Sequence, residues 1–150
     1  MQIGTRFSVA IHILLCVEVF KDKKVTSDFI AGSVNTNPVV IRKIMGLLRE
    51  AGLIDVAAGT GGIALTRSPG KISLLDIYRA ADTVKEGELF KIHEDTAPRC
   101  PVGGSIAELL GGYFESAQEA MEAELARSSL QDLLASLARL RMEKARSRAH

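Results

Sequence analysis

The segment spanning residues 37–52 constrains the fold most, because its start, its period and its end all indicate one helix. Asn37 is a good N-cap, and Pro38 suits the first helical position, where a missing N–H leaves no bond unmade. Gly52 supplies the positive φ with which helices commonly end. The stripe with a period of 3.6 contains Val40, Ile41, Ile44, Leu47, Leu48 and Ala51, and the opposite face contains Arg42, Lys43, Gly46, Arg49 and Glu50. The segment therefore predicts an amphipathic helix over residues 38–51 with a charged outer face.

Two helices are predicted before this segment and a β-hairpin after it. Residues 5–20 are apolar nearly all round, which is typical of a buried core helix, and a second helix begins at Thr26 or Ser27. After Gly52 the pattern changes to two short strands, residues 53–56 and 63–66, and glycines at 59–62 supply the positive φ of their turn. A further helix over residues 74–81 is capped by Ser73. This order of elements is that of a winged helix-turn-helix.

The C-terminal half predicts a loop followed by a long helix. The loop contains Pro98, Pro101 and two glycines. The long helix runs from about Ser105 to Ala126, with an apolar stripe formed by Ile106, Leu110, Tyr113, Ala117, Met121 and Leu125. We expect this stripe to be a homodimer interface, because the first three helices already fill their own core; packing back on the same chain is the alternative. Ser129 caps a last short helix.

The predicted fold is mainly α with a small β-hairpin wing, and it divides into four parts. Residues 1–82 form the winged helix-turn-helix domain and residues 83–104 a sensor-type loop. Residues 105–140 contain the dimerisation helix and the short C-terminal helix. We expect the basic residues 141–150 to be a disordered tail, because the few apolar residues there have no evident partner.

Charge is distributed unevenly along the chain, although the formal net charge is only +1. Residues 1–70 carry 8 Lys or Arg against 5 Asp or Glu, residues 71–138 carry 6 against 12, and residues 139–150 carry 5 against 1. A basic N-terminal half is typical of a domain that meets a polyanion. The N-terminal apolar run is too short to span a bilayer and has no signal-peptide cleavage site, and two cysteines make no disulfide framework. We therefore expect a cytoplasmic protein with no membrane partner.

The outer face of the helix over residues 38–51 is the candidate functional surface. A helix can enter the major groove of DNA only if its outer face and first turn have no role in the core, and this helix meets that condition. Arg42 and Lys43 lie near its N-terminal end and are the better contact candidates, whereas Arg49 could merely complement the helix dipole. Asn37 could contact DNA or serve only as its own helix cap.

Three segments resemble the Rrf family of winged-helix transcriptional regulators, which includes IscR, NsrR and CymR. Residues 35–44 (NTNPVVIRKI) with residues 47–54 (LLREAGLI) are similar to the family's recognition helix. Residues 129–134 (SLQDLL) resemble its T-L-x-D-L signature after the dimer helix. His93-Glu94, followed by Cys100-Pro101-Val102-Gly103, resembles the cluster-less YwnA-type group of the family.

The resemblance implies a homodimer, crossed through the long helix, that reads a palindromic operator in double-stranded DNA. The predicted DNA contacts are Thr26, Asn35, Asn37, Val39, Val40, Arg42, Lys43, Arg49, Gly59, Thr60, Gly61 and Gly62. The family usually has Arg just before the first wing glycine, and this chain has Ala58 there. This departure argues against strong minor-groove reading by the wing, and Arg67 is an alternative phosphate contact.

The sensor-type loop has a single cysteine. Many family members hold an iron–sulfur cluster through three cysteines in this loop, but here only Cys100 is present, and Cys16 belongs to the first helix. We therefore expect no conventional cluster, no other cofactor and no metal site. Cys100, with His93 nearby, is a candidate oxidant sensor whose pKa Arg99 and the following helix start could lower. The alternative is a partly buried thiol that packs beside Pro101.

The chain is predicted to be a transcriptional regulator, a repressor, rather than an enzyme. It has no P-loop, no dinucleotide-binding glycine pattern and no metalloprotease spacing, and the six residues between His93 and Cys100 define no catalytic geometry. The alternative function is a winged-helix module that regulates a partner enzyme by protein–protein contact and binds DNA only weakly.

Overall fold

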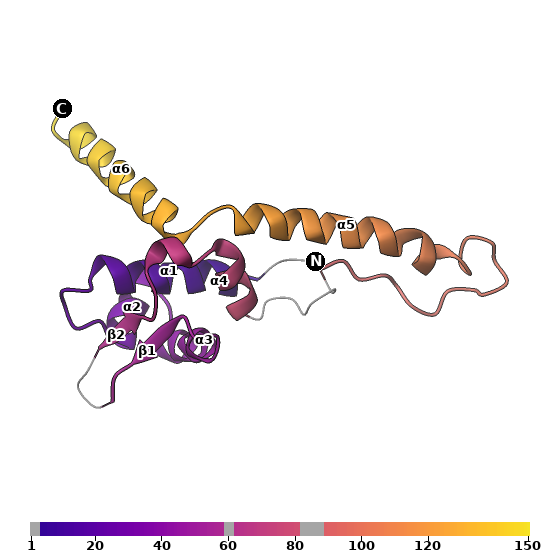
Figure 1. The fold of residues 1–150 in the computed structure, drawn as a ribbon, viewed down its shortest axis with the longest axis horizontal. Coiled ribbons are helices and arrows are strands. Elements are labelled where there is room, and N and C mark those ends of the chain that lie inside the picture. Colours follow the sequence, from indigo (N-terminus) through magenta and orange to yellow (C-terminus); the bar gives the residue numbers. More distant parts are fainter. Residues whose placement is uncertain (1–3, 59–61, 82–88) are drawn as a thin grey trace.

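The computed structural model describes residues 4–58, 62–81 and 89–150, which form a head, an arm and a diverging C-terminal helix (Figure 1). The head contains α1 to α4, the hairpin and a short 3-10 turn, the arm is α5, and the diverging helix is α6. The elements are α1 (Arg6–Val19), α2 (Ser27–Val34), α3 (Pro38–Glu50), β1 (Ile54–Val56), β2 (Ile63–Leu65), η1 (Pro69–Lys71), α4 (Leu74–Ala80), α5 (Ile106–Ala126) and α6 (Leu130–Arg148). The predicted mainly α fold with a β-hairpin wing is confirmed.

The core of the head is built around α1. This helix contacts α2, α3, α4, β2 and α6, and its buried residues are Ala10, Ile13, Leu14, Cys16 and Val17. Three other apolar side chains of α1, those of Ile11, Leu15 and Val19, are only half-buried. The helix is therefore in the core as predicted, but it is not buried nearly all round.

Local signals set the helix boundaries where the sequence predicts them. The Thr26 side chain accepts a hydrogen bond from the Phe29 N–H at 3.2 Å and caps α2. Gly52 has φ +74° after the end of α3, and the Leu53 N–H donates to the Leu48 carbonyl at 3.0 Å. These bonds use backbone groups that helix termini otherwise leave unsatisfied.

The hairpin pairs Ile54 with Leu65 and Val56 with Ile63 in antiparallel register. Ile54 and Ile63 are buried, so one face of the hairpin closes the core beside α3. Gly62 does not have the positive φ that we expected of it, and the tip residues 59–61 lie outside the described part of the chain.

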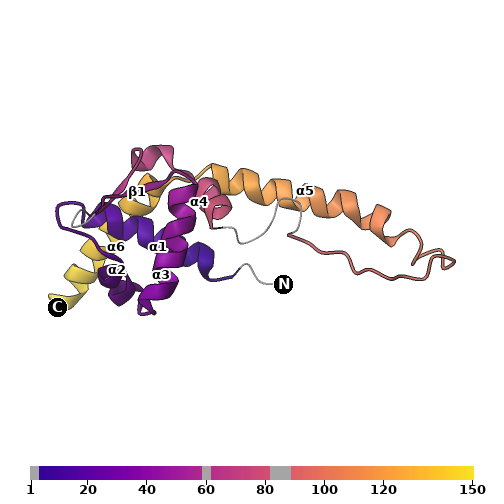
Figure 2. The ribbon, with the colours of Figure 1, turned by 90° about the horizontal axis from the view of Figure 1, so that it is seen from below.

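The arm confirms the predicted long helix. Residues 89–105, the described part of the predicted loop, contain no helix or strand and run beside α5 (Figures 1 and 2). Within α5 the one buried residue is Gln118, whose side-chain oxygen accepts a hydrogen bond from the Leu89 N–H at 3.3 Å. The long helix contacts α4 and the loop, but it buries few of its own side chains.

The last helix is longer than predicted. α6 continues through residues 141–148, which corrects the expectation of a short helix followed by a disordered tail. Residues 130–148 contain no Gly or Pro and are rich in Ala, Leu, Arg and other good helix formers, so nothing in the sequence ends the helix at residue 140. Arg146 and Arg148 in its last turn also suit the negative end of the helix dipole.

Two matching helix starts join α6 to the head. Ser73 and Asp76 form a capping box at α4, and Ser129 and Asp132 form another at α6. The two serines face each other in an antiparallel β-bridge, flanked by hydrogen bonds from the Leu74 N–H to the Ser128 carbonyl at 2.9 Å and from the Leu130 N–H to the Ile72 carbonyl at 2.8 Å. Leu130 is fully buried in the core of the head, so the junction is held by both polar and apolar contacts.

We predict that Leu130→Ala lowers the free energy of unfolding by about 2–5 kcal/mol, because it leaves a cavity in a packed core. Leu140→Ala on the same helix is the matched control, since Leu140 is 50% exposed, and should change stability by no more than about 0.5 kcal/mol. Urea unfolding followed by circular dichroism measures both. Equal losses in the two variants would contradict the placement of Leu130.

Candidate nucleic-acid interface

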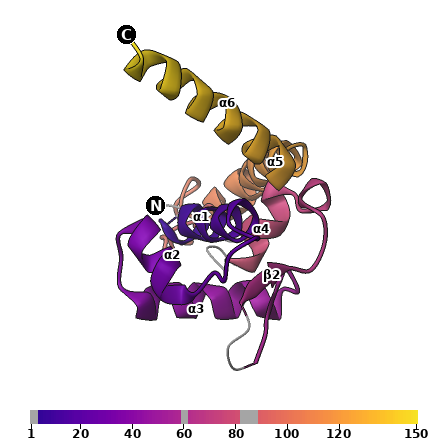
Figure 3. The same cartoon turned by 90° about the vertical axis from the view of Figure 1, so that its left-hand side faces the viewer.

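α3 presents a free outer face at the edge of the head (Figures 2 and 3). Its buried side consists of Ile41, Ile44, Met45 and Leu48. Val40, which the period assigned to the core stripe, is 43% exposed, and Val39 is 63% exposed. Met45 occupies the core in its place, so the buried stripe is rotated relative to the prediction. Two apolar side chains are thereby left in solvent at the N-terminal end of the helix.

The N-terminus of α3 is electropositive. The Asn37 side-chain oxygen accepts a hydrogen bond from the Val39 N–H at 2.9 Å, and no acidic residue lies in the first turn. The helix dipole therefore adds partial positive charge where Arg42 and Lys43, both exposed, also lie. Asn37 is used as a cap, which was one of its two predicted roles.

Arg42 is held in position by α2. Its Nε donates to the Ser27 hydroxyl at 3.3 Å, and its Nη2 lies 3.5 Å from the Asp28 carboxylate. All of these contacts are exposed, and an ion pair of this kind contributes little stability. The pair can therefore be exchanged for a contact with a ligand at small cost. Ser27 and Asp28 were not predicted in this role, because side chains that meet across two helices leave no periodic signal in the sequence.

The remaining predicted contact residues fall into structural and exposed positions. Thr26 is the cap of α2, and Asn35 ends that helix with φ +61°. Asn35 lies at the turn between α2 and α3, whereas Thr26 lies at the other end of α2, next to Ser27. Arg49 is exposed in the last turn of α3, so it complements the helix dipole there.

The wing is described only at its base. Ala58 is exposed, and Gly62 lies close to Val25, although a Cβ there would make ordinary contacts. Gly59, Thr60 and Gly61 lie outside the described residues. Arg67, at the end of the hairpin, donates to the Lys71 carbonyl at 3.3 Å and lies 4.0 Å from the Asp76 carboxylate, so it is bound to the head.

The apolar stripe of α5 is partly exposed. Tyr113 is 72% exposed and Ala117 is exposed, whereas Ile106, Leu110, Met121 and Leu125 are half-buried. Leu109, which the stripe did not include, is 58% exposed. α4 packs against part of α5, and the exposed apolar surface of the helix centres on Leu109 and Tyr113.

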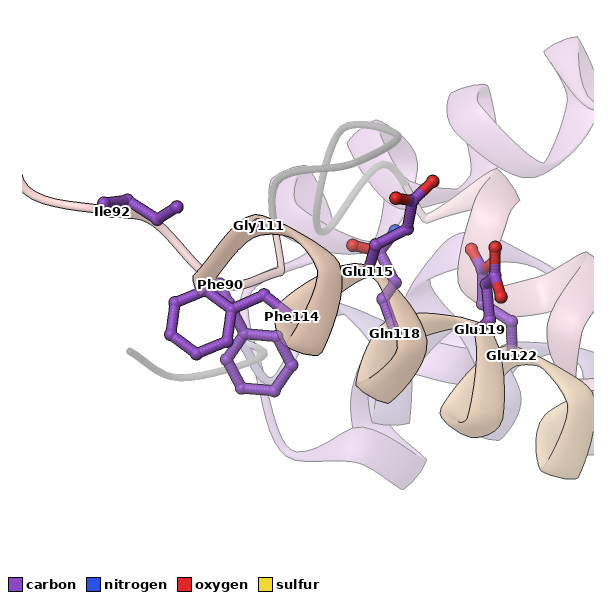
Figure 4. A pocket seen from close by; sticks show the side chains of 8 residues that line it. All are labelled: Phe90, Ile92, Gly111, Phe114, Glu115, Gln118, Glu119 and Glu122. Atoms are coloured by element: carbon purple, nitrogen blue, oxygen red, sulfur yellow. The ribbon is translucent and has the colours of Figure 1, made fainter. Parts of the chain in front are cut away.

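The other side of α5 meets the loop and is acidic (Figure 4). Phe90 stacks on Phe114 with ring centroids 5.1 Å apart. A groove of about 380 Å³ continues from these rings past Glu115, Glu119 and Glu122. Its carboxylates would repel phosphate groups, so this face does not suit nucleic acid.

Cys100 lies in a tightly wound turn just before α5. The thiol is exposed, and backbone N–H groups of Gly103 and Val102 hydrogen-bond to it and lower its pKa. A Cβ on Gly103 would come within 2.8 Å of the Ala97 carbonyl, so the turn requires glycine there. The exposed thiol corrects the alternative of a partly buried one, and the cause of the lowered pKa is the turn rather than Arg99 or the start of α5.

The residues present do not fit an iron–sulfur cluster. Such a cluster needs several thiolate ligands, and the chain has two cysteines. One of them, Cys16, is buried in α1 and donates a hydrogen bond to the Ser33 hydroxyl. In the described ranges, no three His, Cys, Asp or Glu side chains gather as a metal ion would require. His93 is exposed, and no hydrogen bond or ion pair links it to Cys100.

No helix among the described residues is both long and apolar enough to cross a membrane.

Known proteins of similar sequence and structure are DNA-binding regulators. The family model Rrf2, described as "Iron-dependent Transcriptional regulator", matches residues 3–136. The chain is 47% identical over 133 residues to the "Putative HTH-type transcriptional regulator YwnA" of Bacillus subtilis, covering 89% of this chain and 97% of that protein. A crystal structure described as "a putative DNA binding protein" is 43% identical, with a TM-score of 0.70 over 86% of this chain and 98% of the other.

A more distant structure has the same fold. CymR, the global cysteine regulator of B. subtilis, is 20% identical, with a TM-score of 0.64 over 90% of this chain and 97% of its own. These relatives are transcriptional regulators and not enzymes, in agreement with the sequence prediction. The chain belongs to the Rrf2 family of winged-helix transcriptional regulators.

Proposed function

We propose that the protein is a homodimeric repressor that binds a palindromic operator with α3 in the major groove. The observation that carries the proposal is the exposed N-terminal half of α3, where Val39 and Val40 lie in solvent beside Arg42 and Lys43. Folding gains nothing from two solvent-exposed valines at neighbouring positions, whereas a DNA-reading surface uses them.

Each part of this surface has a counterpart on DNA. Valine side chains suit the methyl group of thymine, and an arginine can donate two hydrogen bonds to guanine. The electropositive start of α3 suits a phosphate group. The weak Arg42–Asp28 pair orients the guanidinium before binding and releases it at small cost. Repression requires only that the bound protein occupy its operator.

Dimerisation through α5 supplies the second half of the interface. Tyr113 and Leu109 are largely exposed on a helix of 21 residues in which Gln118 is the one buried residue. A second copy packed along this helix buries them and presents two α3 helices to one face of the duplex. The two helices must then lie roughly 34 Å apart, one turn of DNA.

We further propose that Cys100 senses oxidants and that the protein works without an iron–sulfur cluster. The lowered pKa and the exposure of the thiol support a reactive thiolate. The turn that contains Cys100 precedes α5 at the end of the arm far from the head (Figure 1). Oxidation of Cys100 affects α3 through the dimer contact, because the turn that contains Cys100 is remote from the head of its own chain.

We predict tight, salt-sensitive binding to the DNA upstream of its own gene and weaker binding to a scrambled duplex, measured by fluorescence anisotropy at two salt concentrations. Arg42→Ala should reduce operator affinity by roughly tenfold to a hundredfold, because it removes a base contact worth about 1–3 kcal/mol. Arg148→Ala is the matched control, since it removes the same charge from the end of α6, on the side of the head away from α3 (Figure 3).

Equal and weak binding to both duplexes would contradict the repressor and favour the alternative, a module that regulates a partner enzyme by protein contact. Equal losses in the Arg42 and Arg148 variants would contradict the assignment of the α3 face.

We predict that the double variant Tyr113→Glu, Ala117→Glu is a monomer in sedimentation velocity, because two carboxylates then lie on the surface that the partner covers. Ala126→Glu is the control, since Ala126 is exposed on α5 outside the stripe, and it should remain a dimer. An unchanged mass for the double variant would remove the α5 interface from consideration.

We predict that hydrogen peroxide changes the operator affinity of the wild-type protein and of Cys16→Ser, but not of Cys100→Ser. Because the thiolate reacts and its pKa is lowered, the oxidation rate should reach half its maximum at a pH below the ordinary thiol value of 9.0. Anisotropy after timed peroxide exposure across a pH series gives both results. A Cys100→Ser protein that still responds to peroxide contradicts the sensor.

A further inference from the structure

A second, mostly apolar groove lies on the head, away from the DNA-reading face. It is formed by α1, the end of α2 and α6, and it has a volume of about 570 Å³. Small-molecule sites commonly enclose about 300–1,000 Å³ and are lined by apolar side chains with a few polar groups. The groove has the size and composition of such a site.

The groove exists because α1 has a second apolar side. Ile11, Leu15 and Val19 line it and are only half-buried, unlike the fully buried residues on the core side of α1. From α6, Leu137 covers part of this surface. The helix then diverges from the head and leaves the remainder open (Figure 3).

Polar groups lie together within this apolar surface. His12 and Ser33 are joined by a hydrogen bond of 2.8 Å between Nε2 and Oγ, and the Cys16 thiol donates to the same hydroxyl at 3.6 Å. All three residues line the groove. They offer donors and acceptors to a polar atom of a ligand whose body contacts the aliphatic side chains.

The charge of the groove selects for an anion. Arg141 lines it from α6, and no described residue forms an ion pair with this guanidinium. The lining contains no Asp or Glu. An arginine beside a partly desolvated apolar surface binds a carboxylate through two parallel charge-assisted hydrogen bonds.

We propose that this groove is a binding site for a small amphipathic anion, an aliphatic or aromatic carboxylate whose charged end pairs with Arg141 and whose body lies against Ile11, Leu15 and Leu137. Such a ligand contacts α1 and α6 together, so it fixes the direction in which α6 leaves the head. The site does not depend on DNA binding. The groove lies on α1 and α6, whereas the proposed dimer interface lies on α5, and these two C-terminal helices leave the head in different directions (Figure 1).

The test uses two fluorescent probes that differ in charge. Anilinonaphthalene sulfonate has an aromatic body with an anionic end, and phenylnaphthylamine has the same body without the charge. Both are titrated into the full-length wild-type protein. We expect both probes to bind and the sulfonate to bind more tightly.

Variants on α6 separate the charge from the apolar surface. Arg141→Gln should weaken sulfonate binding about tenfold and leave phenylnaphthylamine binding unchanged. The matched control is Arg139→Gln, since Arg139 is on the same helix, bonds to Ser136 and does not line the groove. Leu137→Trp fills the groove and should abolish binding of both probes, whereas Leu140→Trp, one turn further along the exposed part of α6, should not.

Three results would overturn the proposal: sulfonate affinity unchanged in Arg141→Gln, equal losses in Arg141→Gln and Arg139→Gln, or binding of both probes retained in Leu137→Trp. Circular dichroism on each variant shows that the fold is kept. Because Arg139, Leu140 and Arg141 are exposed, three of the four variants are expected to fold as the wild type does.

Discussion

The burial of α1 is the constraint on which the rest of the structure depends. Its core side packs against α3, α4 and β2, and each fully buried aliphatic side chain contributes about 1.5–3 kcal/mol. This contact holds α3 by its inner face and leaves the outer face free. The other side of the same helix supports α6 and forms the floor of the apolar groove. One helix thus positions both the proposed DNA-reading surface and the proposed ligand site.

Each function proposed for this chain uses apolar surface that the core leaves exposed. Val39 on α3, Tyr113 on α5 and Leu15 on α1 lie on three separate surfaces, and each is assigned a different occupant: DNA, a second copy and a small anion. An arginine lies beside two of these surfaces: Arg42 beside the surface on α3, and Arg141 beside the groove on α1. The carboxylates on the groove side of α5 make that side unsuited to nucleic acid.

The sequence predicted elements wherever a short-range rule applies. Asn37, Ser73 and Ser129 cap helices as expected, because a cap depends on residues within three positions of it. Prediction failed where the outcome depends on packing. Met45 rather than Val40 is buried in the core, and this outcome depends on how α1, α2, α4 and β1 pack around α3, which periodicity alone does not specify. The exposure of Cys100 follows from a loop turn whose backbone bonds are not visible in the sequence.

The sequence by itself determined the order of the elements, the winged helix-turn-helix and the outward arginine and lysine of α3, because caps, periods and glycines act over a few residues. Only the tertiary structure decided that Asp28 holds Arg42, that Leu109 and Tyr113 of α5 stay exposed, and that His12, Ser33 and Arg141 share one groove. These features join residues 14 to 129 positions apart along the chain, or depend on what a helix meets when it leaves the head. Such contacts are set by how helices pack, and packing has no signature in a local pattern.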